Sequence, residues 1–255
     1  KTAFFSTMIA AFIGIGIAFF TAKRNFLGRK FLLSLGIVPL CIPPLVIALG
    51  YVGFFGVNGF FSKVISLIFG IEKEKINFLY TTLGVVIAQG FYNFPFVTKI
   101  VSDAWERLPN ETENAARLLG ADEKRIFFTI TLPRLSGAIA AACIPVFLFC
   151  FFSFMIVLLF SPAGNSTLEV ELYHCIRTTL DFSKGVNIVI LESLTSLLVV
   201  FIYSYIIRKN QYRVDGVSFQ EITRYKIGRK PFENKNQIFL EKALFIFLIM
   251  LILLF

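Results

Sequence analysis

Long apolar runs alternate with short polar segments along this chain. The apolar runs cover roughly residues 3–20, 31–55, 78–100, 137–160, 186–207 and 238–255. Most of them approach the ~20 residues that a membrane-spanning helix needs. The pattern therefore predicts an all-α fold, a polytopic transmembrane helical bundle. The first run has neither the basic stretch nor the small-residue cleavage site of a signal peptide, so we expect it to span the membrane.

Composition agrees with a membrane protein and narrows its chemistry. Hydrophobic residues make up 56% of the chain and charged residues 16%, against about 25% charged in soluble domains. The four cysteines form no Cys-x-x-Cys pair, and His174 is the only histidine. A metal site built on histidines and a Ser-His-Asp triad are therefore not expected. A membrane enzyme would need a cluster of acids, histidines or nucleophiles at one membrane face, and the charged segment described next is the only such concentration.

A charged segment interrupts the apolar runs between residues 103 and 134. It carries six acidic and five basic residues. Each charge would cost several kcal/mol in lipid, so we expect this segment to face water.

The first part of this segment predicts a short amphipathic helix. Pro109 can open the helix, and Ala115, Leu118 and Leu119 fall on one face of it. Gly120 can end the helix, because glycine adopts the left-handed conformation of a helix cap at little cost. These features favour a docking surface over an irregular loop.

The second part predicts another short helix. Asp122 is expected to cap its start, with Ile126, Phe127 and Ile130 clustered on one side. Pro133 is expected to break it, since proline cannot donate the backbone hydrogen bond that a helix interior needs.

At these residues the chain resembles the permease subunits of binding-protein-dependent ABC importers. Their cytoplasmic loop reads Glu-Ala-Ala, three residues, Gly, nine residues, Ile, one residue, Leu-Pro. Asn114 replaces the first residue of that motif, and the acid stands one position earlier at Glu113. The resemblance implies that residues 103–136, here called the coupling loop, dock on a separate ATPase. The implied ATPase-coupling residues are Glu113, Asn114, Ala115, Ala116, Gly120, Ile130, Leu132 and Pro133. An amphipathic loop of some other membrane protein is the alternative.

Segments outside the coupling loop are similar to the thiamine and ferric-iron permeases of this group. They are residues 93–98, 153–159, 166–173 and 181–182. In that group one polypeptide carries two homologous halves. The resemblance implies a five-helix permease core at 1–207, a basic cytoplasmic linker at 208–237, and the first helix of a second half at 238–255. We expect the sequence, which begins with Lys1, to be part of a longer protein.

Basic residues predict the orientation. The loops at 21–30, 99–136 and 208–237 hold 18 of the 25 Lys and Arg residues. By the positive-inside rule these loops are cytoplasmic, which places the start of the chain outside. The net charge of +9 then reflects anchoring beside anionic lipid, and we expect no nucleic-acid partner.

Two runs contain residues that are unusual in a membrane span. Pro39, Pro43 and Pro44 predict a kinked helix packed against protein or a cavity, because lipid cannot replace the lost hydrogen bonds. Gln89 and Asn93 lie one turn apart, and either form interhelical hydrogen bonds or line the translocation pathway.

Glu192 lies seven residues into the fifth run, roughly 10 Å below the outer surface. An intramembrane acid marks a solute or ion route by default. The alternative is a protonated or snorkelling side chain bonded to a neighbouring helix.

The resemblance implies a transport subunit of a bacterial inner membrane rather than an enzyme. It would take a small solute from an extracytoplasmic binding protein docked around residues 56–77 and 161–185. Thiamine is the first expectation and ferric iron the second. The chain has no Gly-x-x-x-x-Gly-Lys-Ser/Thr sequence, so ATP and magnesium are expected on the partner ATPase. A second permease half or a second copy would complete the pathway. A channel or an ATP-independent carrier is the alternative class.

Overall fold

The structure of the protein is a computed structural model. It describes residues 1–26, 29, 33–34, 41–70, 78–162, 166–211, 225–226, 242–243 and 245–246. The expected linker at 208–237 and the expected helix at 238–255 lie almost entirely outside these residues and stay predictions.

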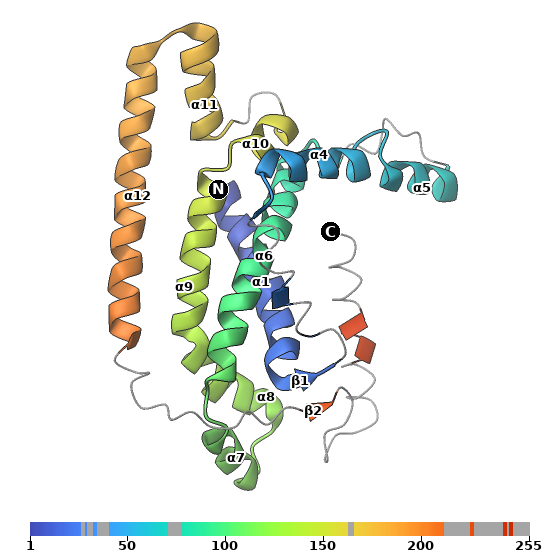
Figure 1. Ribbon diagram of the computed structural model, residues 1–255, viewed down its shortest axis with the longest axis vertical. Helices are drawn as coiled ribbons and strands as arrows, with labels where there is room; N and C mark the ends of the chain where they lie inside the picture. The colour runs from blue at the N-terminus through green and yellow to red at the C-terminus, as the bar shows by residue number, and fades with distance from the viewer. Residues whose placement is uncertain are drawn as a thin grey trace. The chain divides into compact units, whose positions relative to one another are not determined.

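The described chain is helical, which confirms the all-α prediction (Figure 1). Two residues of β1 (Arg24–Asn25) pair in parallel with two of β2 (Tyr225–Lys226). The helices are α1 (Thr2–Lys23), α4 (Pro44–Phe55), α5 (Phe60–Phe69), α6 (Thr82–Glu106), α7 (Glu111–Leu118), α8 (Glu123–Ile126), the π-helical turn η2 (Phe127–Thr131), α9 (Leu132–Phe151), α10 (Met155–Phe160), α11 (Leu168–His174), the π-helical turn η3 (Cys175–Thr179) and α12 (Phe182–Gln211).

Two compact units share the chain. The first comprises Lys1–Ala10, Val38–Asn93 and Ile144–Ile202. The second comprises Ala11–Ile37, Phe94–Cys143 and Tyr203–Phe255. The boundaries fall inside α1, α6, α9 and α12.

Among the residues that the structure describes, four helical stretches are long and apolar enough to cross a membrane. They are Thr2–Lys23, Pro44–Phe69, Glu123–Phe151 and Phe182–Ile207. The expected span at 78–100 forms α6, which has the length but is not among the four. Its polar residues lower its hydropathy, and several of them, Gln89, Asn93, Thr98 and Ser102, are buried in the protein.

The prediction of a helix kinked at interior prolines is wrong for Pro43 and Pro44. Pro44 is the first residue of α4, and Pro43 precedes it in an extended conformation. The N–H groups of the first turn of a helix have no partner within the helix, so proline, which lacks an N–H, can begin a helix without bending it. Pro39 lies outside the described residues.

The fourth apolar run, expected as one helix, is divided. α9 ends at Phe151, and α10 begins at Met155 after a short non-helical link. Ile156, Val157 and Phe160 of α10 pack against Ala48 and Tyr51 of α4 in the core of the first unit. The chain breaks between α9 and α10 because α10 packs into this core as a separate helix.

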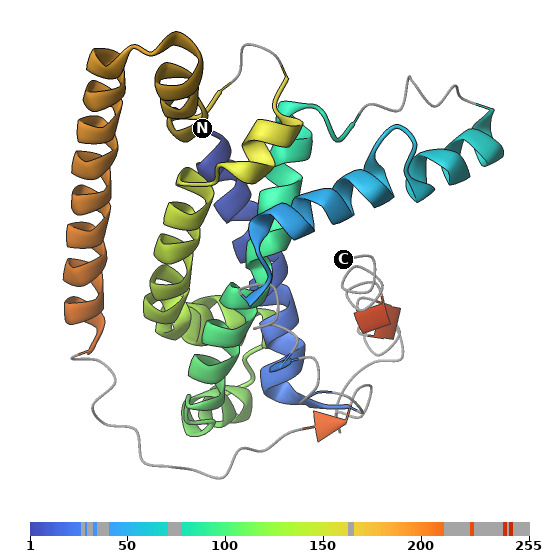
Figure 2. The same cartoon turned by 45° about the horizontal axis from the view of Figure 1, so that its top comes forward.

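α11 and α12 form a helical hairpin (Figure 2), and α12 belongs to the first unit as far as Ile202. Leu180 makes the turn with a left-handed φ of 53°, and the Asp181 N–H donates to the Cys175 carbonyl at 2.9 Å. A Cβ on Gly185 would lie 3.6 Å from Ile176, so the two helices pack closely at their join.

Close helix contacts also organise the second unit. A Cβ on Gly14 of α1 would lie 2.7 Å from the Val97 Cβ of α6, so only glycine fits there. The Thr21 hydroxyl donates to the Ser102 hydroxyl at 2.9 Å, joining the same two helices. Trp105 is buried between aromatic rings of α1 and η2.

Pro133 does not break the helix, contrary to the prediction. Glu123–Phe151 forms one helical stretch, with the π-helical turn η2 directly before α9. In this turn the Leu132 N–H donates to the Phe127 carbonyl, one residue further back than in an α-helix. The wider turn accommodates proline, which lacks an N–H and clashes with the carbonyl four residues before it in an α-helix.

Candidate functional site

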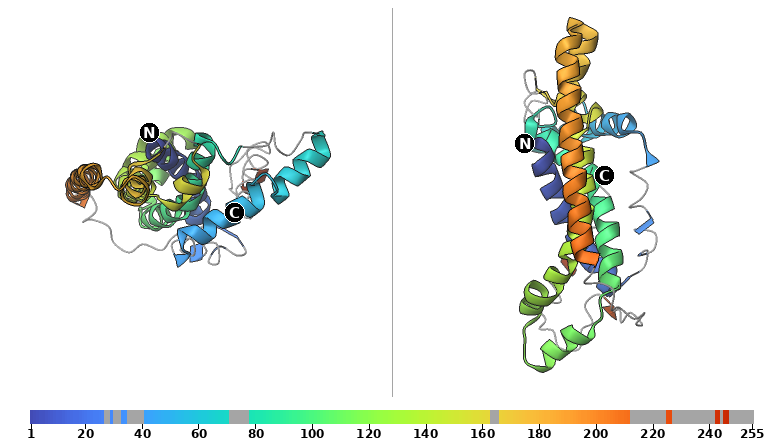
Figure 3. Two further views of the ribbon diagram at one scale, coloured as in Figure 1. Left: turned by 90° about the horizontal axis from the view of Figure 1, so that it is seen from above. Right: turned by 90° about the vertical axis from the view of Figure 1, so that its left-hand side faces the viewer.

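The coupling loop folds as a hairpin of α7 and α8 (Figure 3). α7 begins at Glu111, two residues after Pro109, with Asn110 at the N-cap position. Glu111 and Glu113 lie in its first turn and Arg117 in its last. Acids near the start of a helix and a base near its end both stabilise it through the helix dipole.

Gly120 ends α7 in the predicted left-handed conformation. Its φ is 82°. The Gly120 N–H donates to the Arg117 carbonyl at 2.9 Å, and the Ala121 N–H donates to the Ala116 carbonyl at 3.0 Å. This pair of bonds is the Schellman motif, which satisfies the last carbonyls of a helix and turns the chain sharply.

Apolar side chains are exposed at the tip of this hairpin, residues 118–119. Leu118 is 90% exposed and Leu119 is 88% exposed. Asn114 and Ala115 are also exposed, whereas Ala116 is half-buried. Neighbouring exposed leucines at the end of a helix are typical of a docking surface.

Glu113 points the other way, into the protein. Only 5% of the residue is exposed. Its Oε2 accepts a hydrogen bond from the Lys23 ammonium at 2.7 Å, and its Oε1 accepts one from the Thr131 hydroxyl at 2.9 Å. The Lys23 ammonium also donates to the Asn110 side-chain oxygen at 3.1 Å. Sequence reasoning missed Lys23 and Thr131, because nothing in their local pattern signals this contact.

Arg117 holds α7 and α8 together. Its guanidinium contacts both carboxylate oxygens of Glu123, at 2.5 and 3.2 Å. It also donates to the Asn114 side-chain oxygen at 2.7 Å. Asn114, the residue at the motif's first position, therefore supports the hairpin from its own helix.

The second half of the motif follows the hairpin. Ile126 is buried, and Phe127 and Ile130 are half-buried, which confirms the predicted one-sided cluster. Leu132 is half-buried and Pro133 is exposed. The structure therefore brings Glu113 together with η2, while Pro133 remains on the surface.

Gln89 and Asn93 form a buried polar network in the first unit. The Ser6 hydroxyl of α1 donates to Gln89 Oε1 at 2.8 Å, and Gln89 Nε2 donates to the Cys150 carbonyl at 3.4 Å. Asn93 Nδ2 donates to the Gln89 carbonyl at 2.9 Å and contacts the Cys150 thiol at 3.4 Å. Asn93 Oδ1 is buried without a partner among the residues that the structure describes. Interhelical hydrogen bonding therefore occupies most of these groups.

Glu192 is buried on α12. It is 6% exposed, and within the described part of the chain its Oε1 has no hydrogen-bond partner. α12 begins at Phe182, earlier than the expected run, so Glu192 lies about 15 Å along the helix from its start.

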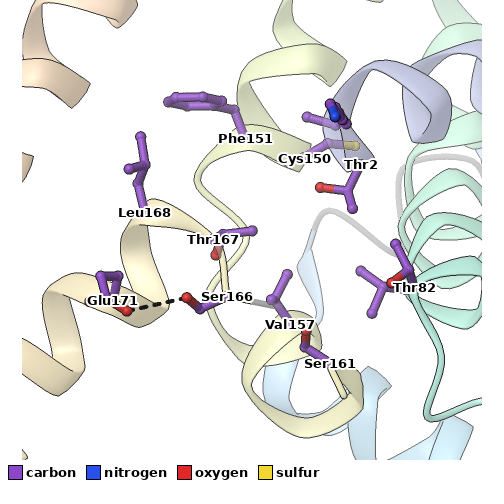
Figure 4. Close-up of a pocket in the computed structure, with 13 residues that line it drawn as sticks. Thr2, Thr82, Cys150, Phe151, Val157, Ser161, Ser166, Thr167, Leu168 and Glu171 are labelled. Atoms are coloured by element: carbon purple, nitrogen blue, oxygen red, sulfur yellow. Dashed lines mark hydrogen bonds between the residues drawn. The ribbon is translucent and has the colours of Figure 1, made fainter. Parts of the chain in front are cut away.

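A pocket of about 580 Å³ opens in the first unit (Figure 4). Its lining residues come from the start of the chain, α6, the end of α9, α10, and α11 with the segment that leads into it, which no local sequence pattern could bring together. Glu171 accepts hydrogen bonds from Ser166 at 3.2 Å and from Lys184 at 2.5 Å. The Lys184 hydrogen bond and charge lower the pKa of the Glu171 carboxyl. Five hydroxyl residues line the pocket: Thr2, Thr82, Ser161, Ser166 and Thr167.

No three His, Cys, Asp or Glu side chains gather into a metal-binding group among the residues described here.

The fold is shared with a solved transporter. A chain of the MetNI methionine ABC transporter, solved in inward-facing conformations, matches with a TM-score of 0.59 at 14% sequence identity. The match covers 82% of this chain and 91% of that chain. The chain therefore shares its helical fold with a chain of an ABC transporter.

Sequence comparison gives the family. Residues 12–215 match the family described as binding-protein-dependent transport system inner membrane component. The chain belongs to this family, which confirms the resemblance predicted from the coupling loop.

Three relatives show the range within the family. The sulfate transport system permease protein CysT of Escherichia coli (strain K12) is 33% identical over 140 residues, which cover 55% of this chain and 48% of that protein. The thiamine transport system permease protein ThiP of Brucella abortus (strain 2308) is 27% identical over 199 residues, which cover 77% and 36%. The molybdenum transport system permease protein ModB of Haemophilus influenzae (strain ATCC 51907 / DSM 11121 / KW20 / Rd) is 33% identical over 129 residues, which cover 50% and 54%. The chain spans about half the length of the sulfate permease and about a third of the thiamine permease.

Proposed function

We propose that this chain is the membrane-spanning permease subunit of an ATP-driven importer. It moves a small solute from an extracytoplasmic binding protein into the cytoplasm, and ATP and magnesium act on a separate ATPase subunit. The observation that carries this proposal is the hairpin tip, where Leu118 and Leu119 are exposed on a helix otherwise fixed to the protein. The chain itself is a transport subunit and not an enzyme.

The proposed mechanism is mechanical. The leucines at the tip, together with Asn114 and Ala115, fit a cleft of the ATPase. The Gly120 turn and the contact between Arg117 and Glu123 keep the hairpin rigid, so a displacement of the ATPase moves the whole coupling loop. Because Glu123–Phe151 is one helical stretch, the displacement passes directly into α9. Alternating access then follows by rocking of packed helices.

The proposed location is the bacterial inner membrane, with the coupling loop cytoplasmic and the start of the chain outside. The excess of Lys and Arg in the loops at 21–30 and 99–136 supports this orientation. A second permease half or a second copy of this chain completes the pathway.

The solute is proposed to be thiamine, with ferric iron as the other cation. The outer segments of the chain are similar to the thiamine and iron permeases, and the alignment with the thiamine permease covers 77% of the chain. An oxyanion such as sulfate is a second candidate, since the sulfate permease is 33% identical over its shorter alignment. Uptake of labelled thiamine, ferric iron and sulfate by the complete complex distinguishes these solutes.

Co-purification with the ATPase subunit tests the docking surface. Burying one leucine side chain stabilises a contact by about 1.5–3 kcal/mol. Leu118→Ser should therefore weaken ATPase binding by roughly tenfold or more. Leu67→Ser is the matched control, because Leu67 of α5 is 89% exposed but lies on the predicted outer side. Equal ATPase binding by Leu118→Ser and the wild type would refute the proposal.

A channel or an ATP-independent carrier remains the alternative class. Such a protein would take up solute in vesicles that lack the ATPase subunit. Uptake that requires both ATP and the ATPase subunit would exclude it.

Glu192, Gln89 and Asn93 are the proposed pathway residues. The buried, unpartnered oxygen of Glu192 suits a cationic solute, because a carboxylate offsets the cost of removing a cation from water. Glu192→Gln keeps the size of the side chain and removes its charge. We expect it to slow thiamine uptake in complexes matched for amount and for ATPase activity. Unchanged uptake would remove Glu192 from the pathway and leave Gln89 and Asn93.

A further inference from the structure

Glu113 is the acid nearest the start of the motif, yet its side chain faces away from the docking surface. At 3.6 residues per turn it lies about 200° around α7 from Ala115, which is exposed. Its carboxylate contacts Lys23 of α1 and Thr131 of η2, and lies 3.5 Å from the Arg117 guanidinium of its own helix. Glu113 could reach another subunit only by leaving Lys23 and Thr131.

We propose that Glu113 is a positioning residue that fixes the coupling loop to the end of α1. Through Lys23 and Thr131 it makes α7, the end of α1 and the π-helical turn move as one body. This inference rests on the proposed function for its consequence, which is that α1 receives the displacement of the ATPase as directly as α9 does.

The helix dipoles favour both charges of this contact. Lys23 is the last residue of α1, where the helix dipole favours a cation. Glu113 lies in the first turn of α7, where the dipole favours an anion. The Lys23 ammonium also binds the side chain of Asn110, the N-cap residue of α7. The end of one helix is therefore bound to the start of the other at two points.

Thr131 closes the contact from the other side. It is buried and is the last residue of η2. The extra residue of a π-helical turn changes the angular position of the side chains that follow, relative to an α-helix. Thr131 lies at the end of this turn and donates to Glu113 Oε1, while Pro133 continues into α9.

Burial makes the contact discrete. The Glu113 side chain is 7% exposed and that of Lys23 is 19% exposed, so separating this partly buried ion pair disfavours intermediate arrangements. The coupling loop therefore does not rotate independently of α1. The hydrogen bond between Thr21 and Ser102 extends the connection to α6.

Three variants test the connection. Glu113→Gln removes the charge, Thr131→Val removes only one hydrogen bond, and the double exchange Lys23→Glu with Glu113→Lys reverses the pair. Lys99→Glu is the control, since it breaks an exposed ion pair of Lys99 with Asp103 on α6. The complex, reconstituted in vesicles, is assayed for ATP hydrolysis and for uptake of labelled thiamine, with labelled sulfate in a parallel series.

We expect Glu113→Gln to lower the solute transported per ATP hydrolysed by roughly tenfold, while ATPase binding stays within about threefold. Thr131→Val should give a smaller loss, and Lys99→Glu should stay within about twofold of wild type. The exchanged pair should recover only part of the ratio, because it restores the attraction between the two side chains but reverses their helix-dipole contributions and loses the Thr131 hydrogen bond. Loss of ATPase binding with an unchanged ratio would make Glu113 a contact residue and overturn the inference. If Glu113→Gln does not assemble, the Thr131→Val and exchanged-pair complexes decide by the same ratio.

Amide hydrogen exchange of the complete chain tests the connection without relying on transport. Glu113→Gln should speed exchange in both α7 and the last turn of α1, and the exchanged pair should restore part of the protection at both. Faster exchange in α7 alone would overturn the inference. A wild-type complex without ATP-dependent uptake would instead overturn the proposed function, and the exchange result would still decide whether the two helices are joined.

Discussion

Substitution of Gly120 tests the coupling loop, because its free-energy cost arises from the backbone conformation alone. Its φ of 82° is in the left-handed region, and a Cβ built there would meet nothing within 4 Å. Steric conflict inside the chain is therefore absent at this residue, and only the backbone conformation opposes a side chain. A residue with a Cβ costs about 1–2 kcal/mol in this conformation.

That cost converts into a predicted affinity. A penalty of 1–2 kcal/mol lowers the equilibrium constant for forming the docking-ready turn by about 5- to 30-fold, and the affinity for the ATPase subunit falls by up to the same factor. Gly120→Ala should show this loss. Gly120→Asn should lose much less, since asparagine tolerates the left-handed conformation, and Gly120→Val should lose more, since β-branched residues rarely adopt it.

Titration of the ATPase subunit onto the detergent-solubilised chain measures these affinities. Gly53→Ala is the control, because Gly53 lies inside α4 with no positive φ and nothing within 4 Å of its Cβ. Alanine there should leave ATPase binding unchanged. An equal affinity for Gly120→Val and the wild type would refute the argument that the left-handed turn is required for docking.

Further predictions concern packing, pH and topology. Gly14→Ala should lower the free energy of unfolding in detergent by about 1–3 kcal/mol, because the new Cβ would lie 2.7 Å from the Val97 Cβ of α6. Gly16→Ala should be neutral or stabilising, because a Cβ there would meet nothing within 4 Å. The Lys184 ammonium lowers the pKa of the Glu171 carboxyl below its usual 4.5, so the contact between them is present at pH values above 4.5 and is lost as the pH falls through the lowered pKa. Amide exchange in α11 should rise over that pH range. Lys184→Met should abolish this pH dependence. Leu118→Cys should be shielded from an impermeant external thiol reagent in intact cells, and labelling from outside would contradict the proposed topology.

Local backbone chemistry was the most predictable part of the fold. Gly120 is the clearest case, since a glycine after an amphipathic stretch indicates a left-handed cap, and the Schellman bonds confirm it. The one-sided cluster around Ile126 was equally predictable from its spacing. Both depend on residues within one or two turns of each other.

The predictions made from proline were wrong where the position of the proline within its helix differed from the expected one. Pro43 and Pro44 were expected inside a helix because the apolar run is continuous around them, but α4 begins there. Pro133 was expected to end a helix, but the π-helical turn before it removes the conflict. Hydrophobicity marks the extent of an apolar run and not the point at which its helix starts, bulges or stops.

The inward side of the candidate site was not predictable. Glu113 was grouped with the docking residues by its place in the sequence, and its burial depends on Lys23, ninety residues earlier. The pocket beside Glu171 likewise combines four separate segments. Contacts at such separations leave no periodic signal in a single sequence.

The exposed leucines have a consequence for how the protein is made. On the proposed function, Leu118 and Leu119 stay exposed at the end of the hairpin until an ATPase subunit covers them. Such a surface is also what chaperones and proteases bind on incompletely assembled proteins. On the proposed function, the same two side chains would serve both for assembly and for recognition of an unassembled copy.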